Sequence, residues 1–375
     1  MTTKEADYPK LKIDDIRIYR FDIPLKDVFE IATMSIDNAQ NVLVQMITNQ
    51  GVVGWGEASS LRSIVGETQL INFAAAKELK QIFLGKNPLA VAALVEEMDY
   101  FLPHNTTIKA AFDMALYDIT AQVAGLPLYL YLGGRQREIE TDLTIGLCDP
   151  SEAGEKATAV REMGFRMIKV KVGTNLQDDF TRLTNIRKAA GSEAVIRIDA
   201  NQGWDRIAAI TNLKAFEEFE VEFCEQPCRA PDLAGMKFVS EHASIPVMAD
   251  ESLFSPYDAL NIIQQDAAPY LNIKLTKSGG IYNALKIAHI AEAGARPCMI
   301  GCMAESKLGI TAATHFATAN SNVRFFDLDS HLEHAEDPVE GGITIENGMI
   351  TLPDTPGIGA VPAPDYLRRL EEIKE

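Results

Sequence analysis

Five charged residues recur at nearly one interval in the second half of the 375-residue chain. They are Lys171, Asp199, Glu225, Asp250 and Lys274, in steps of 24 to 28 residues. A strand, a helix and two short loops together take about that many residues, so each charge holds the same place in successive βα units. In a (β/α) barrel the C-terminal strand ends carry the chemistry. Two amines and three carboxylates meeting there indicate a divalent metal between two bases.

The three carboxylates each end an apolar run of the sequence. The runs close on Asp199-Ala200-Asn201, Glu225-Gln226-Pro227 and Asp250-Glu251. An aspartate at the start of a strand-to-helix loop often caps the helix, which is the alternative interpretation. Capping does not explain three carboxylates in register between two lysines, where mutual repulsion calls for a cation. All-oxygen ligation suits Mg²⁺, so the sequence predicts a magnesium site.

The lysines supply the proposed bases. Lys169 and Lys171 end one run, and strand alternation places both ammonium groups on one side. Two adjacent cations repel, so we expect the pKa of one of them to be lowered, which suits a general base. Lys274 ends a later run, and we expect it across the barrel mouth from Lys171. A surface lysine pair is the alternative interpretation for Lys169 and Lys171.

The elements that position these residues are eight short apolar runs whose starts are 24 to 27 residues apart. They lie at Asp142–Gly146, Met167–Val172, Ala194–Ala200, Val221–Gln226, Pro246–Glu251, Tyr270–Leu275, Pro297–Cys302 and Arg324–Asp329. Helical patterns separate them, for example at Glu152–Met163, Asp178–Ala190, Tyr257–Gln265 and Gly280–Ala293. Strands alternating with helices predict a parallel sheet, and eight repeats predict a closed barrel. No strong helix follows the eighth run, so the prediction is a (β/α)7β modified TIM barrel.

The first part of the chain has a different pattern. Residues 11–60 read as strands, including a hairpin whose turn contains Gly51, and residues 67–125 carry helical periodicity. We therefore expect an α/β protein with an N-terminal α+β capping domain at residues 1–138. The tail, residues 343–375, is expected to complete that domain, and residues 139–342 are expected to form the barrel with the catalytic site.

Composition narrows the function classes. The net charge of −18 argues against a nucleic-acid partner, and no apolar run is long enough to predict a membrane span. Residues 1–7 show no apolar signal core, and five cysteines do not suggest a disulfide framework. The pairs Cys224/Cys228 and Cys298/Cys302 are interpreted as buried free thiols rather than metal ligands. These features favour the cytoplasm and leave the oligomeric state open, a homo-oligomer included.

Several motifs together resemble the muconate-lactonising subgroup of the enolase superfamily. They include Gly54-Trp55-Gly56-Glu57-Ala58, the Lys-x-Lys at 169–171, the Ala-Asp-Glu-Ser at 249–252, the Lys-Leu-x-Lys-x-Gly-Gly at 274–280 and Pro356-Gly357-Ile358-Gly359. The resemblance implies Asp199, Glu225 and Asp250 as Mg²⁺ ligands, with Lys169 on the substrate carboxylate. It implies Lys171 and Lys274 as paired acid/bases for α-proton transfer through an enediolate, Lys171 on the L face and Lys274 on the D face.

A further motif, Asp327-Leu328-Asp329, ends the eighth run. It resembles the dipeptide epimerases of the superfamily, in which this motif holds the substrate's α-ammonium group; a capping or salt-bridged pair is the alternative interpretation. A zwitterion needs an anionic clamp at one end and cations at the other. By the same resemblance, Thr144, Cys302 and Ala304 contact the dipeptide, the 302–304 segment chiefly through backbone groups. His331 and His334 are interpreted as part of an ordinary polar loop rather than a second metal site.

Substrate specificity is expected to come from a loop of the first domain. The candidate loop is Phe29–Met34, and in resembling enzymes that prefer Ala-Glu an arginine stands near the place of Met34. An adaptable thioether suits apolar partners, so we predict Ala-X dipeptides with small or hydrophobic X, such as Ala-Ala or Ala-Val. Arg62 keeps an L-Ala-D/L-Glu epimerase open as an alternative. An o-succinylbenzoate synthase and an N-acylamino acid racemase, which would use the same metal and lysines, are the rival functions.

Overall fold

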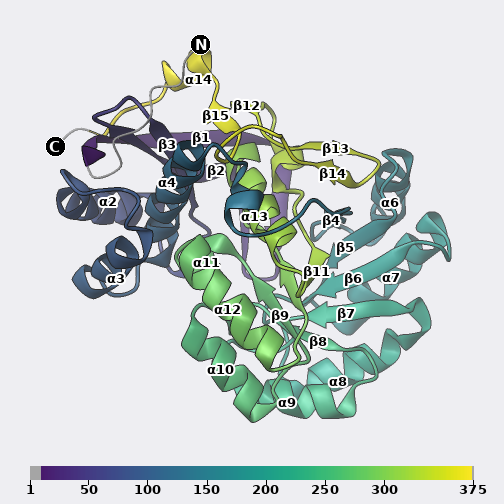
Figure 1. The fold of residues 1–375 in the computed structure, drawn as a ribbon. Helices are drawn as coiled ribbons and strands as arrows, with labels where there is room; N and C mark the ends of the chain where they lie inside the picture. The colour runs from purple at the N-terminus through teal and green to yellow at the C-terminus, as the bar shows by residue number, and fades with distance from the viewer. Residues whose placement is uncertain (1–9, 374–375) are drawn as a thin grey trace.

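The structure is a computed structural model that describes residues 10–373. Residues 1–7, on which the absence of a signal peptide was predicted, lie outside the described range. The described chain contains a three-stranded antiparallel sheet and an eight-stranded parallel sheet, with two further two-stranded sheets in the tail. In Figure 1 the antiparallel sheet and its helices lie over one side of the parallel sheet.

The antiparallel sheet has the order β1–β2–β3. Its strands are β1 (Ile13–Ile31), β2 (Met34–Thr48) and β3 (Val53–Ser59). The predicted hairpin is confirmed, because β2 and β3 pair antiparallel around a turn in which Gly51 adopts φ of 82°. The ladder between β1 and β2 is interrupted between Pro24 and Phe29. This irregularity lies in the part of β1 that reaches the barrel mouth.

The segment with helical periodicity, residues 67–125, forms three main helices. They are α2 (Gln69–Phe83), α3 (Val91–Phe101) and α4 (Thr106–Ala124), preceded by the short α1 (Arg62–Val65) and followed by the short α5 (Leu128–Tyr131). Helix α4 packs so closely on β3 that a Cβ added to Gly54 or Gly56 would lie 2.2 or 1.9 Å from a carbonyl oxygen of α4. This approach explains the paired glycines of the Gly54-Trp55-Gly56 motif.

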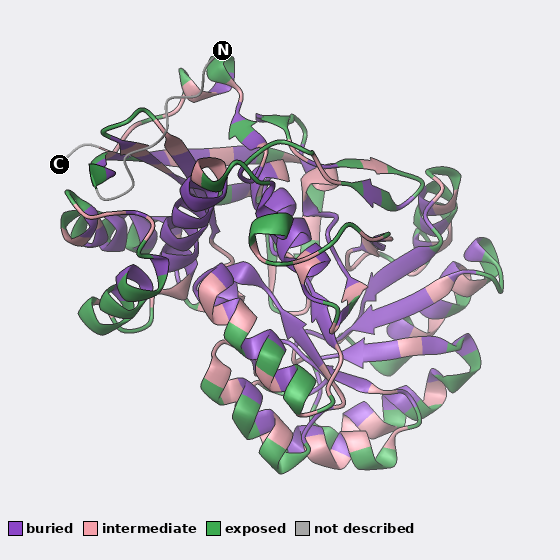
Figure 2. Cartoon of the chain, in the orientation of Figure 1, coloured by how far each residue is buried: buried purple, intermediate pink, exposed green. Residues whose placement is uncertain are grey.

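The parallel sheet contains eight strands in chain order. They are β4 (Leu143–Ile145), β5 (Met167–Lys171), β6 (Val195–Asp199), β7 (Val221–Glu225), β8 (Val247–Ala249), β9 (Tyr270–Ile273), β10 (Cys298–Ile300) and β11 (Val323–Phe326). Each coincides with one of the eight apolar runs. Most strand residues are buried, whereas the helices expose their outer faces (Figure 2), as expected for strands covered on both sides.

Seven helices follow the first seven strands. They are α6 (Ala153–Glu162), α7 (Leu176–Ala190), α8 (Arg206–Ala215), α9 (Leu233–His242), α10 (Pro256–Gln265), α12 (Ile281–Ala293, after the short α11, Leu275–Ser278) and α13 (Lys307–Ala319). The short 3-10 helix η2 (Glu217–Phe219) precedes β7, and the 3-10 turn η3 (Ser330–Glu333) takes the place of a helix after β11. The predicted (β/α)7β architecture is confirmed.

The first and last barrel strands are joined by side chains. The backbone N–H of Leu328 donates to Thr141 Oγ1 at 2.8 Å, and that of Thr144 donates to Asp329 Oδ2 at 2.6 Å. Inside the barrel, Arg197 of β6 donates to Asp142 at 2.8 Å and to the carbonyl of Phe326 at 3.0 Å. Polar side chains therefore fasten β11 beside β4, and one of them is a predicted site residue.

The tail contacts both parts of the molecule. Strands β12 (Val339–Gly341) and β15 (Ala360–Pro362) pair antiparallel, and after α14 (Pro364–Leu367) the chain bonds to β1 through Arg20 N–H to Glu371 O at 2.9 Å. The hairpin of β13 (Thr344–Glu346) and β14 (Met349–Thr351) instead bonds to residues 139–141, beside the barrel.

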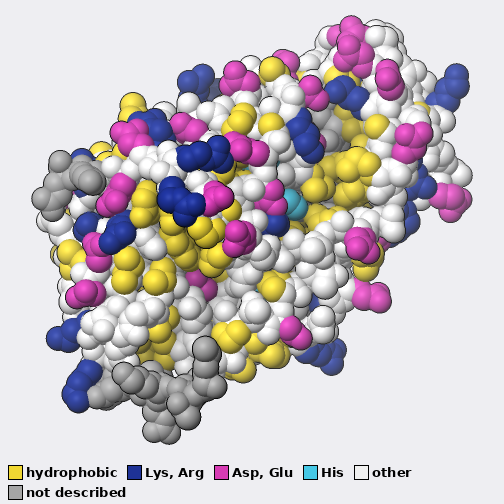
Figure 3. Space-filling model, turned by 90° about the horizontal axis from the view of Figure 1, so that it is seen from above, with side chains coloured by type: hydrophobic (Ala, Val, Ile, Leu, Met, Phe, Trp, Pro, Cys, Tyr) yellow, Lys and Arg dark blue, Asp and Glu magenta, His cyan; other side chains and the backbone are white. Residues whose placement is uncertain are grey.

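The surface and the cysteines agree with the composition. None of the helices described is long and apolar enough to cross a membrane. On the face shown in Figure 3, lysine and arginine side chains are scattered among aspartate and glutamate. All five cysteines are free; Cys224, Cys228 and Cys298 are buried, whereas Cys302 is half-buried.

Candidate active site

The periodic charges converge at one end of the parallel sheet. Lys171, Asp199 and Glu225 are the last residues of β5, β6 and β7, and they are in register with one another across the strands. Asp250 directly follows β8, and Lys274 directly follows β9. All five are buried. The constant sequence interval therefore corresponds to one ring of side chains at the C-terminal strand ends.

The three carboxylates form a compact cluster. Asp199, Glu225 and Asp250 are fully buried, and each offers an oxygen within 4.8 Å of the others. Burial and the charges of Asp199 and Asp250 hold the pKa of Glu225 well above its ordinary value, despite the opposing effect of nearby lysines. A divalent cation offsets this repulsion, and an all-oxygen donor set fits Mg²⁺. The residues present therefore fit the predicted metal.

Two further side chains hold the cluster. Asn272 donates to Glu225 Oε1 at 2.5 Å. Lys277, fully buried, bonds to the Asp250 carboxylate and donates to the Asn272 carbonyl at 3.0 Å. The sequence analysis gave Lys277 no role of its own, although it is the second lysine of the motif at residues 274–280. It orients the carboxylate of Asp250, one of the three predicted metal ligands.

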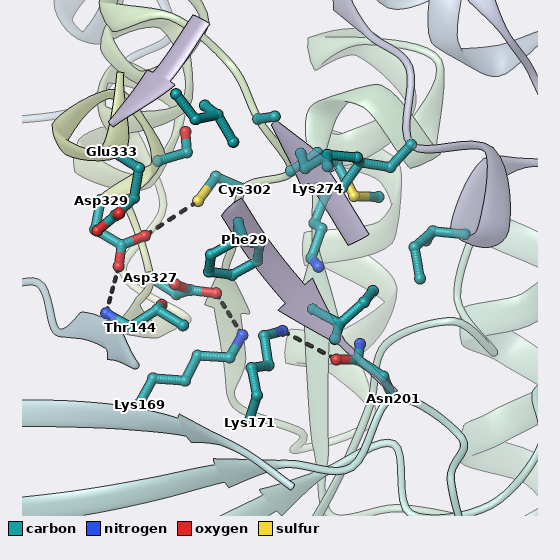
Figure 4. Close-up of a pocket in the computed structure, with 18 of the residues that line it drawn as sticks. Phe29, Thr144, Lys169, Lys171, Asn201, Lys274, Cys302, Asp327, Asp329 and Glu333 are labelled. Atoms are coloured by element: carbon teal, nitrogen blue, oxygen red, sulfur yellow. Dashed lines mark hydrogen bonds and ion pairs between the residues drawn. The ribbon is translucent and has the colours of Figure 1, made fainter. Parts of the chain in front are cut away.

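The lysines lie against the carboxylates. Lys169 Nζ is 2.7 Å from both Asp327 and Glu225, Lys171 Nζ is 2.6 Å from Asp199, and Lys274 Nζ is 2.8 Å from Asp250. Lys171 also donates to Asn201 at 3.1 Å. The ammonium ends of Lys171 and Lys274 point toward one another (Figure 4). This is the arrangement that two bases on opposite faces of one substrate carbon require.

The predicted repulsion between neighbouring lysines does not dominate. Burial lowers the pKa of Lys169, but Asp327, Glu225 and Asp199 outweigh it and hold that pKa well above its usual range. The pKa of Lys274 is likewise raised, because Asp250 and Glu225 outweigh burial. The prediction of a lowered pKa named neither lysine of the pair, and it does not hold for Lys169, around which carboxylates dominate.

A second pair of carboxylates lies beside Lys169. Asp327 bonds to that lysine, whereas Asp329 accepts from Thr144 N–H and from Cys302 Sγ, the latter at 3.5 Å. Burial and the charge of Asp327 raise the pKa of Asp329 to about 7. A cation bound here would favour the ionised form of both carboxylates. The structure thus brings Thr144, Cys302, Asp327 and Asp329 together, as predicted.

Thr144, Cys302, Asp327 and Asp329 face one cavity between the barrel and the first domain. Its barrel side carries Lys169, Lys171, Lys274 and the Asp327/Asp329 pair. Its other side is apolar and comes mainly from the first domain. The apolar lining consists of Leu25, Phe29, Ile31, Ile36, Leu61, Ile64 and Met303.

Met34 does not line this cavity. It lies with Arg62 in a neighbouring cavity that shares Ile36, Leu61 and Ala304 with the first. The loop Phe29–Met34 does reach the site, but through Phe29 and Ile31. Side chains alternate along an extended segment, and a sequence without structure does not reveal which set turns inward.

The segment after β10 is fixed by the first domain. Ala304 donates its N–H to Ser59 at 3.1 Å and accepts from Asn41 at 2.8 Å, and Glu57 accepts from Ser306 N–H at 2.8 Å. Burial raises the pKa of Glu57 to about 7. The backbone N–H of Met303 also donates a hydrogen bond, to the carboxylate of Glu305 at 2.5 Å. Ala304, predicted to offer backbone groups to a substrate, therefore holds the two domains together.

The turn after Asp329 is part of the site. His334, predicted to belong to an ordinary polar loop, is only 5% exposed and lines the cavity, as do Ser330 and Glu333. That interpretation was wrong for His334. The signal available in the sequence was its position only five residues beyond Asp329, in a turn too short to leave the barrel mouth.

Two family profiles match the chain. Residues 152–366 match the enolase C-terminal domain-like family, and residues 15–133 match the N-terminal domain of mandelate racemase/muconate lactonizing enzymes. The chain belongs to the enolase superfamily. Within it, this chain carries both domains of a mandelate racemase/muconate lactonizing enzyme, and the resemblance inferred from its motifs is confirmed.

The superfamily relatives include curated and solved dipeptide epimerases. The chain is 41% identical to an L-Ala-D/L-Glu epimerase of Clostridium acetobutylicum, covering 92% of this chain and 98% of the relative. A dipeptide epimerase from Cytophaga hutchinsonii, solved with Mg and D-Ala-L-Val, superposes with a TM-score of 0.95 at 38% identity and covers 96% and 99% of the two chains. The Enterococcus faecalis V583 dipeptide epimerase, solved with Mg and L-Leu-L-Tyr, gives 0.91 at 38% identity, covering 93% and 99%.

Proposed function

We propose that the protein is a Mg²⁺-dependent dipeptide epimerase that inverts the C-terminal residue of its substrate. The observation that carries this proposal is the arrangement of charge along one cavity. Lys171 and Lys274 point toward one another beside the acidic cluster, and Asp327 and Asp329 lie farther along. A dipeptide has the matching ends, a carboxylate and a free ammonium group. Relatives at 38–41% identity that epimerise dipeptides support the assignment.

The residues take the following roles in the proposed reaction. Asp199, Glu225 and Asp250 would hold Mg²⁺, which when bound supplies Lewis-acid stabilisation of charge on the substrate carboxylate. Lys169 adds a positive charge at the same end. One of the two lysines, as a free amine, takes the α-proton of the second residue. The other, as an ammonium, gives a proton to the opposite face, so the configuration inverts without net change in protonation.

The lysines' charge balance depends on the metal ligands. The carboxylates that raise the pKa of Lys274 include Asp250 and Glu225. When a cation engages those carboxylates, their stabilisation of the ammonium weakens and the pKa of Lys274 falls toward the range of a general base. The same three carboxylates would therefore bind the metal and set the pKa of Lys274.

The preferred second residue is proposed to be small or hydrophobic, as in Ala-Ala or Ala-Val. The apolar lining by Phe29, Ile31, Leu61 and Ile64 supports this preference. An L-Ala-D/L-Glu epimerase is the second candidate, because Arg62 lies in the adjoining cavity and a relative with that activity is 41% identical.

A dipeptide library incubated in D₂O with Mg²⁺ decides between the two candidates. Mass spectrometry reports deuterium gain at the α-carbon, and chiral chromatography reports inversion. We expect kcat/KM for Ala-Ala or Ala-Val to exceed that for Ala-Glu. A higher value for Ala-Glu would contradict the apolar preference and favour the L-Ala-D/L-Glu epimerase.

We infer the setting of the enzyme from the same features. Five free cysteines support a reducing compartment, the cytoplasm, and the net charge of −18 supports action without a nucleic-acid partner. We also propose a domain division with residues 1–138 and 343–375 as the cap and 139–342 as the barrel. The bond from Arg20 to Glu371 supports the return of the tail to the cap.

A further inference from the structure

The side chain of a substrate's first residue must lie close to the Asp327/Asp329 pair. This placement rests on the proposed function, in which that pair binds the α-ammonium group. Side chain and ammonium share one carbon, so the groups that contact the side chain must adjoin Asp329. In Figure 4, Asp329 and Glu333 lie at one end of the cavity, away from Asn201.

Most polar groups adjoining Asp329 already have partners. Thr144 N–H and Cys302 Sγ donate to Asp329 itself. The hydroxyl of Ser330 donates to the carbonyl of Glu305 at 2.9 Å. These groups line the end of the cavity, but they already make hydrogen bonds to other groups of the protein.

His334 differs from them. It is 5% exposed, and neither ring nitrogen makes a hydrogen bond within the described residues. The backbone of Ala304 lies close enough to raise the pKa of His334, but no hydrogen bond of good geometry joins it to either ring nitrogen. A buried polar group without a hydrogen bond destabilises the folded protein, and a hydrogen bond to a ligand would remove that cost.

The position of His334 is fixed by its backbone. Leu25 of β1 and His334 form an antiparallel bridge, and the next residue, Ala335, donates its N–H to Pro24 O at 2.8 Å. The backbone that carries the ring is thus held where the first domain meets the barrel. A hydrogen-bonding side chain that is already fixed in a cavity wall can discriminate between ligands, because no entropy is lost in ordering that side chain on binding.

The chemistry of the ring selects a class of partner. Burial, the largest effect, lowers the pKa of His334 to about 4, so the ring is neutral near pH 7 and offers one N–H and one lone pair. A hydroxyl both donates and accepts, and so matches it. Glu333, lining the same end of the cavity, disfavours an acidic side chain by like-charge repulsion.

We propose that His334 hydrogen-bonds a hydroxyl group on the side chain of the substrate's N-terminal residue. The enzyme then favours Ser-X over dipeptides whose first residue is an apolar isostere. This goes beyond the choice of the second residue, since it assigns the first residue a subsite and a chemical class.

The test compares two substrates of nearly equal shape. L-Ser-L-Ala carries a hydroxyl where L-2-aminobutyryl-L-Ala carries a methyl group. We expect the wild-type kcat/KM to be roughly tenfold or more higher for the serine dipeptide. In His334→Leu the ratio should fall to about one, and in His334→Asn, which keeps a donor and an acceptor, it should stay above one.

His331→Leu is the matched control, because His331 is in the same turn but does not line the cavity. It should keep the wild-type ratio. A wild-type ratio near one, or an unchanged ratio in a folded His334→Leu, overturns the His334 subsite while leaving dipeptide epimerisation intact. Failure of the wild-type enzyme to epimerise Ala-Ala or any other dipeptide overturns the proposed function itself, and this inference with it.

Discussion

At the scale of single residues, the site consists of carboxylates and lysines that neutralise one another. Lys169 contacts the carboxylates of Asp199, Glu225 and Asp327. It therefore links the predicted metal cluster to the Asp327/Asp329 pair. The ladder of charges could be predicted from sequence because parallel strands repeat the position of a strand end. The sequence could not predict which side chains of the 29–34 loop face the cavity, because that depends on the register of β1 against β2.

Replacing Asp327 and Asp329 together by Asn tests the ammonium clamp. The change keeps the shape of the side chains and removes two negative charges, so binding of a free α-ammonium should weaken. We expect kcat/KM for Ala-Ala to fall by about 10²-fold or more, since charge-assisted bonds contribute about 1.5–3 kcal/mol each.

Substrates without a free amine provide the contrast for that double variant. A retained lyase activity of the o-succinylbenzoate synthase type, or retained racemisation of an N-acylamino acid, would favour the rival functions. Unchanged epimerisation of Ala-Ala by the double variant would show that the carboxylates have a structural role only.

At the scale of elements, one buried side chain joins the cap to the barrel. Asp113 of α4 accepts from the backbone N–H groups of Ile281 and Tyr282, the first two residues of α12. A carboxyl group at a helix N-terminus satisfies donors that the helix leaves free. Helix α4 could be predicted from its periodicity, but this contact between residues 168 positions apart could not.

Burial raises the pKa of Asp113 from 3.8 to about 8, against the two backbone hydrogen bonds that lower it. Well below pH 3.8 the group is protonated in both folded and unfolded states. As pH rises toward 8 the unfolded state releases this proton and the folded state keeps it, so stability is lost over that window, by at most about 1.4 kcal/mol per pH unit.

Asp113→Asn should therefore flatten the pH dependence of the free energy of unfolding between pH 5 and 8. Urea unfolding followed by circular dichroism at several pH values measures the free energy of unfolding of each variant. Asp14→Asn, at an exposed position, is the control. A wild-type profile that Asp113→Asn does not alter would show that Asp113 titrates normally.

At the scale of the whole molecule, two domains share one cavity. The barrel provides the charges, and the first domain provides the apolar wall and the bonds that hold the segment after β10. Sequence periodicity predicted both domains and the missing eighth helix. It could not predict the hydrogen bonds that hold β4 beside β11, because they depend on single contacts such as that between Thr144 and Asp329.

Mg²⁺ should stabilise the whole fold. Three buried carboxylates repel, so a cation that binds only the folded state raises the free energy of unfolding, by about 2.7 kcal/mol at one hundred times its dissociation constant. Thermal unfolding with Mg²⁺ and with EDTA measures the shift. Glu225→Gln should remove most of it, and an equal shift in that variant would place the metal elsewhere.

The most direct test of the two-base mechanism follows the α-proton in D₂O with Lys171→Ala and Lys274→Ala, each incubated with Ala-L-Ala and Ala-D-Ala. We predict that neither variant epimerises either dipeptide, and that each exchanges the α-proton of one epimer only: the L form in Lys274→Ala and the D form in Lys171→Ala. The exposed Lys188→Ala should behave as wild type. Full epimerisation by either active-site variant would contradict the two-base mechanism.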